Sequence, residues 1–341
     1  MLTSSSLTLR GDEVDRLSLL AFKAEIVGDR MAILTSWNES LHFCEWPGIS
    51  CGRRHQRVTV LDLRSSRLGG QLSPNIGNLS FLRTLNLENN SFNSSIPPEI
   101  GRLFRLQRLR LGNNSFRGDI PVSISRCSKL RYLDLGNNIL GGKIHNEIGF
   151  LSNLQVLNLG KNRLSGEIPP SLGNLSSLQM LSLQQNNLHG ANMFTGRVPN
   201  LARMSNLFRV EMDANNLGNN EEGDLDFLSS LVNCTNLKRL DISDNKFGGV
   251  LPESLSNLST KLEVMRLGGN QMRGSIPVDI GNLNNLGILG FEANQLTGPI
   301  PSSISKLSKL YDLSLNHNEL SGNNSWILKF SKRDRRYRPL S

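Results

Sequence analysis

The sequence has few aromatic residues, few cysteines and no long apolar run. Aromatic residues make up 6% of the 341 positions, and there are only four cysteines. Four are too few for a disulfide scaffold of this length, and no stretch approaches the roughly 18 consecutive apolar residues of a transmembrane helix. Hydrophobic residues still account for 38% of the chain, which excludes a disordered protein. A chain this long exceeds a usual single core, so we expect several domains or a repeat array.

The positive charge is concentrated at the carboxyl end. Lys and Arg number 38 against 29 Asp and Glu, a formal net charge of +9. Residues 326–341 hold six basic residues and one acidic residue, which is +5 and leaves +4 for the rest. A body this weakly basic gives no argument for nucleic-acid binding. We expect the tail to be a disordered end, with a nuclear address or an anionic-lipid patch as alternatives.

No residue set indicates catalysis, a metal or a cofactor. The histidines are scattered, and no carboxylate or thiol grouping completes a metal site; they are His42, His55, His145, His189 and His317. No nucleophile is placed with a base and an orienting group. We therefore expect a protein that is not an enzyme, with no cofactor.

The amino-terminal residues lack the cationic start and apolar stretch of a secretory signal. Either the signal lies upstream or the chain is not exported, and we expect residues 1–11 to be disordered. From Asp15 to Ile26 the spacing predicts a short amphipathic helix. Its apolar positions are Leu17, Leu20, Ala21 and Ala24.

Cys44 and Cys51 are seven residues apart and enclose Trp46 and Gly48. This spacing favours a disulfide-closed loop in an oxidising compartment, which would contribute roughly 2–3 kcal/mol on the chain-entropy model. A zinc site is the alternative, but the nearby histidines do not complete a usual ligand spacing.

A repeat begins at Val58, with the template L-x-x-L-x-L-x-x-N-x-L-x-G-x-I-P. Successive units start 24 residues apart five times, then 29, 30, 25, 24 and 24 residues apart. The eleven first apolar residues are Val58, Leu82, Leu106, Leu130, Leu154, Leu178, Leu207, Leu237, Leu262, Leu286 and Leu310. This period is that of a leucine-rich repeat.

Each repeat should supply one short strand and one turn. Within L-x-L the period of two sends both leucines to one face of the strand. A single strand cannot bury that face, so stacked neighbours should form a parallel sheet over a continuous leucine core. Ile-Pro or Leu-Pro ends six repeats, and we expect short irregular or helical turns after the proline. Cys127 and Cys234 share one repeat position four units apart, too far for a disulfide, and should be buried.

An asparagine recurs just after each predicted strand. There the chain turns inward, and an amide side chain can both donate to and accept from the backbone groups that lose water. We predict a ladder formed by Asn90, Asn114, Asn138, Asn162, Asn186, Asn215, Asn245, Asn270, Asn294 and Asn318, with Ser66 in the first unit.

Two places break the period. Six surplus residues lie between Gly190 and Val198, which we interpret as a bulged loop or a scar of lost repeats. An acidic insertion runs from Gly218 to Phe227, and we expect it to project from the scaffold.

The variable positions around the strand leucines should face the concave side of the array. Charged residues and one aromatic residue on a rigid arc favour a protein-binding surface. The candidates are Arg108, Arg110, Tyr132, Asp134, Arg209, Glu211, Asp213, Arg239, Asp241, Asp244 and Arg266.

Nine N-x-S/T sequons together favour a secretory destination, although each alone is a weak signal. They are Asn38, Asn78, Asn89, Asn93, Asn113, Asn174, Asn233, Asn257 and Asn323. Because Asn233 precedes Cys234, we expect it to be partly buried and the poorest acceptor.

The 24-residue template with G-x-I-P resembles the plant-type leucine-rich repeat of receptor-like kinase ectodomains. The segments Asp15–Lys23, Ser36–Asn38 and Cys44–Cys51 resemble that family's amino-terminal cap. Residues 216–283 resemble the subgroup of the rice bacterial-blight resistance receptor and the bacterial elongation-factor receptor. The resemblance implies a right-handed α/β repeat solenoid, with a cap at 12–57, about eleven repeats at 58–325 and a non-repeat tail at 326–341.

The resemblance also implies a function. Such ectodomains bind peptide or protein ligands and co-receptor ectodomains at the extracellular face of the plasma membrane or in the apoplast, here in pathogen perception. Kinase motifs and a membrane span are absent from this sequence, so it is expected to represent the ligand-binding part only. The alternatives are a secreted inhibitor resembling the polygalacturonase-inhibiting proteins, disfavoured by the missing cysteine-bearing end cap, and a non-functional truncated product.

Overall fold

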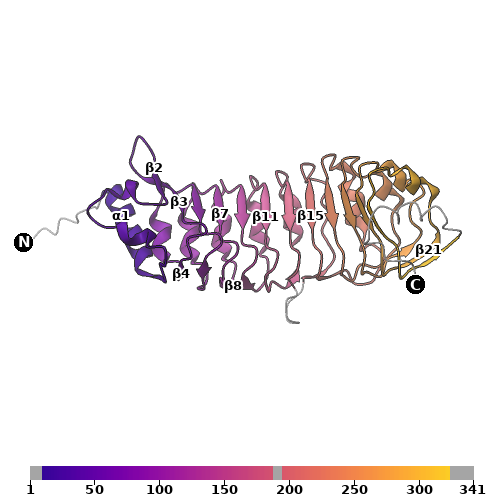
Figure 1. Cartoon of the computed structure of the whole chain (residues 1–341), viewed down its shortest axis with the longest axis horizontal. Helices are drawn as coiled ribbons and strands as arrows, with labels where there is room; N and C mark the ends of the chain where they lie inside the picture. Colours follow the sequence, from indigo (N-terminus) through magenta and orange to yellow (C-terminus); the bar gives the residue numbers. More distant parts are fainter. Residues whose placement is uncertain (1–9, 187–193, 323–341) are drawn as a thin grey trace, which may run out of the picture. The chain divides into compact units, whose positions relative to one another are not determined.

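The computed structural model describes residues 10–186 and 194–322, in two compact units that divide between Leu140 and Gly141. In each unit, coil after coil adds a short strand to a parallel sheet, which is the leucine-rich-repeat solenoid predicted from the period (Figure 1). Our expectations for residues 1–9, for the surplus residues at 187–193, and for Asn323 and the basic tail lie outside the described residues.

The first unit begins with a helical cap and continues as coils. Its helices are α1 (Gly11–Ala24) and the 3-10 turns η1 (Ile33–Ser36), η2 (Phe43–Glu45), η3 (Pro74–Asn78), η4 (Pro98–Arg102) and η5 (Val122–Arg126). Its sheet strands are β2 (Ile49–Cys51), β3 (Val58–Asp62), β5 (Thr84–Asn86), β7 (Arg108–Arg110) and β9 (Tyr132–Asp134). Its short outer strands are β1 (Ile26–Val27), β4 (Gly69–Gly70), β6 (Ser91–Phe92) and β8 (Arg117–Asp119), while β10 (Ile139–Gly141) reaches the division.

The second unit repeats the same order. Its sheet strands are β11 (Val156–Asn158), β13 (Met180–Ser182), β15 (Arg209–Glu211), β17 (Arg239–Asp241), β18 (Val264–Arg266), β20 (Ile288–Gly290) and β22 (Asp312–Ser314). Its outer strands are β12 (Gly166–Glu167), β14 (Phe194–Gly196), β16 (Asn216–Leu217), β19 (Arg273–Gly274), β21 (Gln295–Pro299) and β23 (Glu319–Ser321). Its helices are η6 (Asn146–Phe150), η7 (Pro170–Asn174), α2 (Asp226–Ser230), η8 (Leu231–Asn233), η9 (Glu253–Asn257), η10 (Ile280–Asn282) and η11 (Ser302–Lys306).

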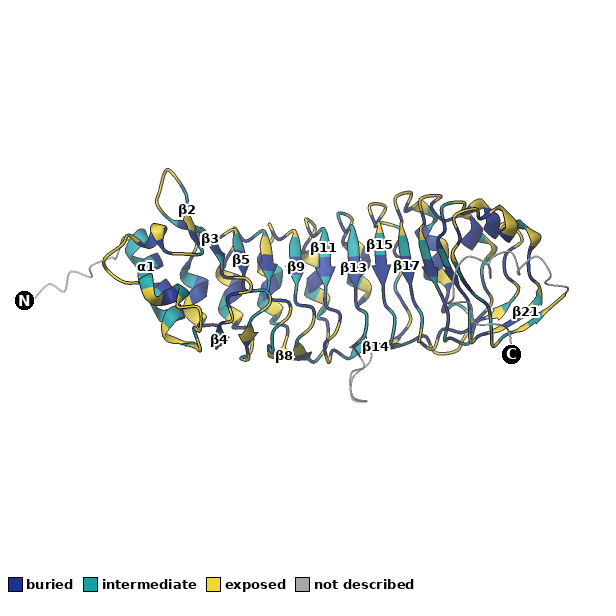
Figure 2. Ribbon diagram, viewed as in Figure 1, coloured by how far each residue is buried: buried dark blue, intermediate teal, exposed yellow. Residues whose placement is uncertain are grey.

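The leucine register forms the core of each unit. Leu85 pairs with Leu109 and Leu109 with Leu133 across the parallel strands of the first unit, and all three side chains are fully buried. Residues on either side of each leucine face outward, because strand side chains alternate. Figure 2 shows buried and half-buried residues together on the sheet strands. Most prolines of the Ile-Pro endings lead into a 3-10 turn, as in η4, η5, η7, η9 and η11.

The asparagines after the strands hold neighbouring coils together. The Nδ2 of Asn245 donates to the carbonyls of Met212, Ile242 and Ser243 at 3.0, 3.1 and 3.0 Å. Its Oδ1 accepts from the Leu217 amide at 3.0 Å. One amide thereby satisfies four backbone groups that have lost water. In the first coil the neighbouring Asn90 supplies this contact, accepting from the Ser66 and Leu68 amides.

The helix α1 packs on a different face from the one we predicted. Leu17 is 42% exposed, whereas Asp15, Ser18, Leu19 and Phe22 are buried. Asp15 can be buried because Arg57 forms an ion pair with it at 2.7 Å and the Val58 amide donates to it at 2.8 Å. A polar residue therefore lies on the buried side, and the apolar spacing alone indicated the wrong stripe.

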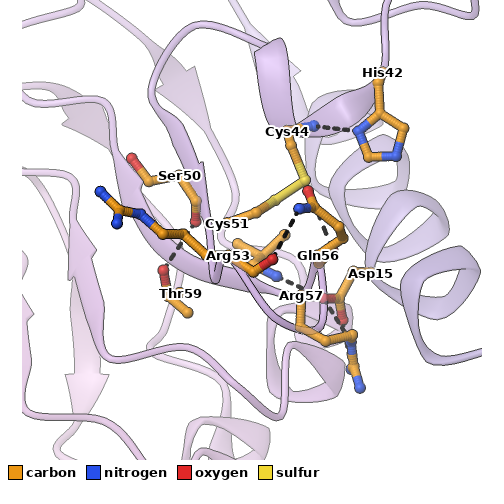
Figure 3. Close-up of a disulfide and its surroundings, with 10 residues drawn as sticks. Asp15, His42, Cys44, Ser50, Cys51, Arg53, Gln56, Arg57 and Thr59 are labelled. Atoms are coloured by element: carbon orange, nitrogen blue, oxygen red, sulfur yellow. Dashed lines mark hydrogen bonds and ion pairs between the residues drawn. A yellow bond between two sulfur atoms is a disulfide. The ribbon is translucent and has the colours of Figure 1, made fainter.

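A disulfide joins Cys44 and Cys51, linking η2 to β2 in the cap. Figure 3 shows that the Asp15–Arg57 ion pair lies close to this loop and that His42 faces back to the Cys44 amide. The Nδ1 of His42 accepts from that amide at 3.2 Å. The cysteines are therefore used in a covalent link, in agreement with the disulfide interpretation.

The acidic insertion does not project along its whole length, contrary to our expectation. Asn219 to Glu222 are exposed, but Asp224, Leu225, Phe227 and Leu228 are buried. The Oδ2 of Asp224 accepts from the amides of Asn219, Glu221 and Gly248. The carboxylate thus organises the insertion against the next coil, and its apolar residues start α2. At the other break, Phe194–Gly196 pairs with β12 and β16, so this second ending continues the outer strands.

Candidate functional site: the strand face

We use the name strand face for the outward side chains of the sheet strands and the residues directly after them. Each lies one or two positions from a buried apolar residue of the strand, such as Leu109 or Val210, so its place is set by the rigid register of the coils. Of the eleven residues predicted for this face, Arg108 and Asp244 are exposed and seven are half-buried. Glu211 and Asp241 are instead buried, at 1% and 3% exposure.

In the first unit, the strand face carries arginines around one tyrosine. The guanidinium carbons of Arg108 and Arg110 lie 5.1 and 5.8 Å from the centre of the Tyr132 ring. Cation–π contacts at this range are favourable by about 0.5–1 kcal/mol at exposed sites. Both guanidinium groups come from the neighbouring strand β7 and lie over the tyrosine ring, and Asp134 lies two residues after Tyr132 on β9.

A second aromatic contact lies beside the first strands and was not found from the sequence. Phe81 is sandwiched between Arg105, whose guanidinium carbon is 3.8 Å from the ring centre, and Arg57 at 4.6 Å. His55 meets the same ring edge-on. Phe81 and Arg105 are one repeat of 24 residues apart, so the repeat register could have predicted that they are neighbours on adjacent coils.

In the second unit, five residues form a continuous chain of opposite charges. Glu211 forms ion pairs with Arg209 and Arg239, each at 2.7 Å. Asp241 forms ion pairs with Arg239 at 3.2 Å and with Arg266 at 3.7 Å. The two carboxylates lie beneath the arginines, which explains their burial. A ligand on this face would therefore meet the arginines before these acids.

Three further carboxyl groups of the second unit lack such a cation. Burial raises the pKa of Asp213 to about 6, and repulsion from Asp241 adds to this. Burial followed by repulsion from Asp241 also raises the pKa of Asp244. Burial raises the pKa of Glu292, with further repulsion from Asp244 and Asp312. Among the described residues none of the three forms an ion pair within 4 Å.

Two glycines give these carboxylates room. A Cβ at Gly268 would lie 2.5 Å from Glu292 Oε1, and at Gly269 a Cβ would approach Asp244 Oδ1 closely. Carboxylates from the preceding and following coils therefore lie over one bare segment of backbone. The resulting surface is acidic, in contrast to the arginine-rich strand face of the first unit.

The sequon asparagines within the described residues are accessible. Asn78 is half-buried, and Asn38, Asn89, Asn93, Asn113, Asn174, Asn233 and Asn257 are exposed. Our expectation that Asn233 is partly buried is wrong. It ends the turn η8, where the side chain points outward although the next residue, Cys234, is buried.

The remaining cysteines are buried thiols. Cys127 and Cys234 have no exposed area, and burial raises their pKa to about 12 and about 11. Each lies close to a backbone carbonyl of the preceding coil, Ile100 at 3.4 Å and Met204 at 3.3 Å. They pack as core residues.

Across residues 10–186 and 194–322, no group of three or more His, Cys, Asp or Glu side chains is arranged to hold a metal ion. Over the same part of the chain, no helix combines the length and the apolar character that a bilayer span requires.

Three family models match the chain. One described as "Leucine-rich repeat region" matches residues 122–275, and "Leucine rich repeat N-terminal domain" matches residues 12–52. A third, "Leucine Rich Repeat", matches residues 81–103 and 105–127. Together they cover the cap and most of the coils.

Several of the similar proteins are plant receptor kinases. The chain is 49% identical over 77 residues to the LRR receptor-like serine/threonine-protein kinase EFR of Arabidopsis thaliana, which is 22% of this chain and 8% of that protein. It is 46% identical over 84 residues to the receptor kinase-like protein Xa21 of Oryza sativa subsp. japonica, or 25% of this chain and 8% of that protein. The matches thus span under a tenth of either relative.

A solved structure extends the likeness over most of the coils. The Arabidopsis receptor kinase HAESA, in complex with the peptide hormone IDA and the co-receptor SERK1, has a TM-score of 0.71 and 30% identity. The match covers 90% of this chain and 54% of the HAESA chain.

Proposed function

Since the chain belongs to the leucine-rich-repeat family of plant receptor-kinase ectodomains, we propose that it binds a peptide or protein ligand on its strand face. A co-receptor ectodomain is the second partner. The observation that carries the proposal is the strand face itself, where charged and aromatic side chains are fixed by a rigid register. Preorganised groups of this kind lose little entropy on binding.

The solved complex supports the choice of ligand and partner. HAESA binds a peptide hormone and the co-receptor SERK1, and the same fold is present here. The resemblance of residues 216–283 to the subgroup of the rice bacterial-blight resistance receptor supports our proposal of a role in plant immune perception. We propose no catalytic role for the chain itself, and the kinase activity of the relatives is not carried over.

The extracellular side of the plasma membrane, or the apoplast, is the proposed location. The Cys44–Cys51 disulfide is typical of an oxidising compartment. Exposed sequons such as Asn113 and Asn257 are suited to glycosylation during secretion.

A binding experiment tests the proposal. The full chain, fused to a secretion signal and immobilised, is exposed to fractionated bacterial extract and to synthetic plant peptide hormones. Saturable binding is expected for one probe, and the double variant Arg108→Ala/Arg110→Ala should weaken it about tenfold or more. Arg126→Ala is the matched control, because this exposed arginine ends the turn η5 and lies off the strand face. The absence of saturable binding, or equal loss in the control, overturns the proposal.

The secreted-inhibitor alternative has its own assay. Purified fungal polygalacturonase is mixed with the chain at equal concentration. Our proposal expects unchanged hydrolysis, and stoichiometric inhibition would replace it with the inhibitor function.

A further inference from the structure

A cleft in the second unit lies directly beside a sequon. It has a volume of about 610 Å³ and is formed where η7 meets the segment after β14. Pockets of about 300–1,000 Å³ are typical for small organic ligands, so this one has room for one or two sugar rings. Asn174, the last residue of η7 and the first of the sequon Asn-Leu-Ser, is part of its lining.

The amide of Asn174 is oriented with its nitrogen free. Arg203 donates from Nη1 to the Oδ1 of Asn174 at 3.3 Å. Within the described residues the Nδ2 makes no hydrogen bond. This nitrogen is the atom to which an N-linked glycan is attached.

Three other sequon asparagines, Asn38, Asn89 and Asn93, line clefts, and the side-chain nitrogens of the first two are engaged in hydrogen bonds. The cleft at Asn93 is smaller, with a volume of about 490 Å³. The Nδ2 of Asn38 donates to the Thr35 carbonyl, and that of Asn89 donates to the Ser65 hydroxyl, each at 3.0 Å. A glycan on either would replace an existing hydrogen bond. A glycan attached to Asn174 would replace no hydrogen bond within the described residues.

The chemistry of the cleft suits a carbohydrate. Pyranose rings have an apolar C–H face and a rim of hydroxyl groups. Ile168, Pro170 and Val198 provide apolar surface, while Arg197, Asn200 and Asn219 provide donors and acceptors around it. Polar groups placed around apolar surface are the usual composition of a small-ligand site.

We propose that Asn174 carries an N-linked glycan whose innermost sugars lie in this cleft. The inference rests on the secretory route proposed above. The sugars fill the space between η7 and the residues after β14, and they cover this side of the coil against protein contacts. Ligand access is then directed to other surfaces of the unit.

Asn257 provides an internal control. It ends η9 as Asn174 ends η7, it is exposed, and it does not line this cleft. A glycan at Asn257 should therefore be open to enzymes, whereas the glycan core at Asn174 should be shielded in the folded protein.

The test uses the full chain with an added secretion signal, expressed in mammalian cells. Native protein is treated with peptide-N-glycosidase in isotopically labelled water, and release at each site is followed by mass spectrometry. We expect both sites to be occupied, with native release at Asn174 about tenfold slower than at Asn257 and equal release after denaturation. Arg203→Ala should speed the native release at Asn174, because the amide loses its fixed orientation.

Two results overturn the inference: an unoccupied Asn174 beside an occupied Asn257, or equal native release at both sites. Because export is supplied by the added signal, these outcomes concern the cleft alone. Failure of ligand binding would concern the proposed function alone.

Discussion

Asn245 shows how one side chain can hold two coils. Its amide makes four hydrogen bonds with backbone groups of its own coil and the coil before. A catalytic interpretation of this asparagine would require a free amide, and none of its hydrogen-bonding groups is free. The side chain is therefore a structural element of the repeat.

Replacing this asparagine should be costly. Asn245→Ala leaves backbone groups unpaired in the interior, and we expect the free energy of unfolding to fall by about 2–3 kcal/mol. Urea denaturation followed by circular dichroism measures the change. Asn282→Ala, at an exposed position in η10, is the control and should change stability little. A loss below that of the control would contradict the ladder's energetic role.

Asp213 should make stability depend on pH. Its folded pKa of about 6 exceeds the unfolded value of 3.8, so the folded state binds the proton more tightly. The cost of ionisation is absent below pH 3.8, grows as the pH rises, and is complete above about pH 6. Asp213→Asn should therefore stabilise the protein by about 1 kcal/mol at pH 7.5, allowing for solvent screening.

The advantage of that variant should shrink as the pH falls from 6 to 4. Thermal unfolding across this range measures it, with Asp119→Asn as an exposed control for net charge. If the stability advantage of Asp213→Asn stays constant with pH, or grows in acid, then burial does not raise the pKa of the Asp213 carboxyl group.

At the scale of elements, the amino-terminal cap depends on two unlike links. The Cys44–Cys51 disulfide closes one loop, and the Asp15–Arg57 ion pair docks α1 onto β3. Trp37 stacks on Trp46 between them, with ring centres 5.2 Å apart. The cap thus covers the first coil with apolar surface, and the disulfide and the ion pair hold that surface in place.

Loss of the disulfide should loosen this cap locally. In the double variant Cys44→Ser/Cys51→Ser we expect about 2 kcal/mol less stability in the cap, because the open loop gains conformational freedom. Trypsin should then cut faster after the exposed Arg53 and Arg54, while cleavage after Arg126 keeps its rate. Free thiols at both positions in secreted wild-type protein would argue against the link.

The elements also show what a sequence can and cannot predict. The period of 24 gave the strands, the ladder and the core, because those depend on residues a fixed distance apart. The buried face of α1 did not follow, since Asp15 is buried by Arg57, 42 residues away. Likewise, Asp224 holds the insertion against the next coil by accepting a hydrogen bond from the Gly248 amide. Glu211 is covered by arginines from two coils. Partners distant in sequence decided each of these cases.

At the scale of the molecule, each coil is bonded mainly to its neighbours. In such arrays stability is roughly a sum of coil and interface contributions. A substitution that destabilises one coil should therefore lower the stability of that coil and its nearest neighbours only.

Hydrogen exchange on Asn245→Ala tests this locality. Amides of β15, β17 and β18 should exchange faster than in the wild type, whereas those of β22 should be unchanged. Uniform acceleration through the second unit would indicate that the unit opens as one cooperative body.

The two buried thiols have a practical consequence for a protein folded under oxidising conditions. Cys127 and Cys234 are fully enclosed and resist ionisation, and the thiolate is the form that reacts. Once folded, they cannot exchange with the bridge in the cap or form mixed species with small oxidants. Alkylation of either sulfur thus reports the transient opening of the coil around it, a native probe that needs no engineering.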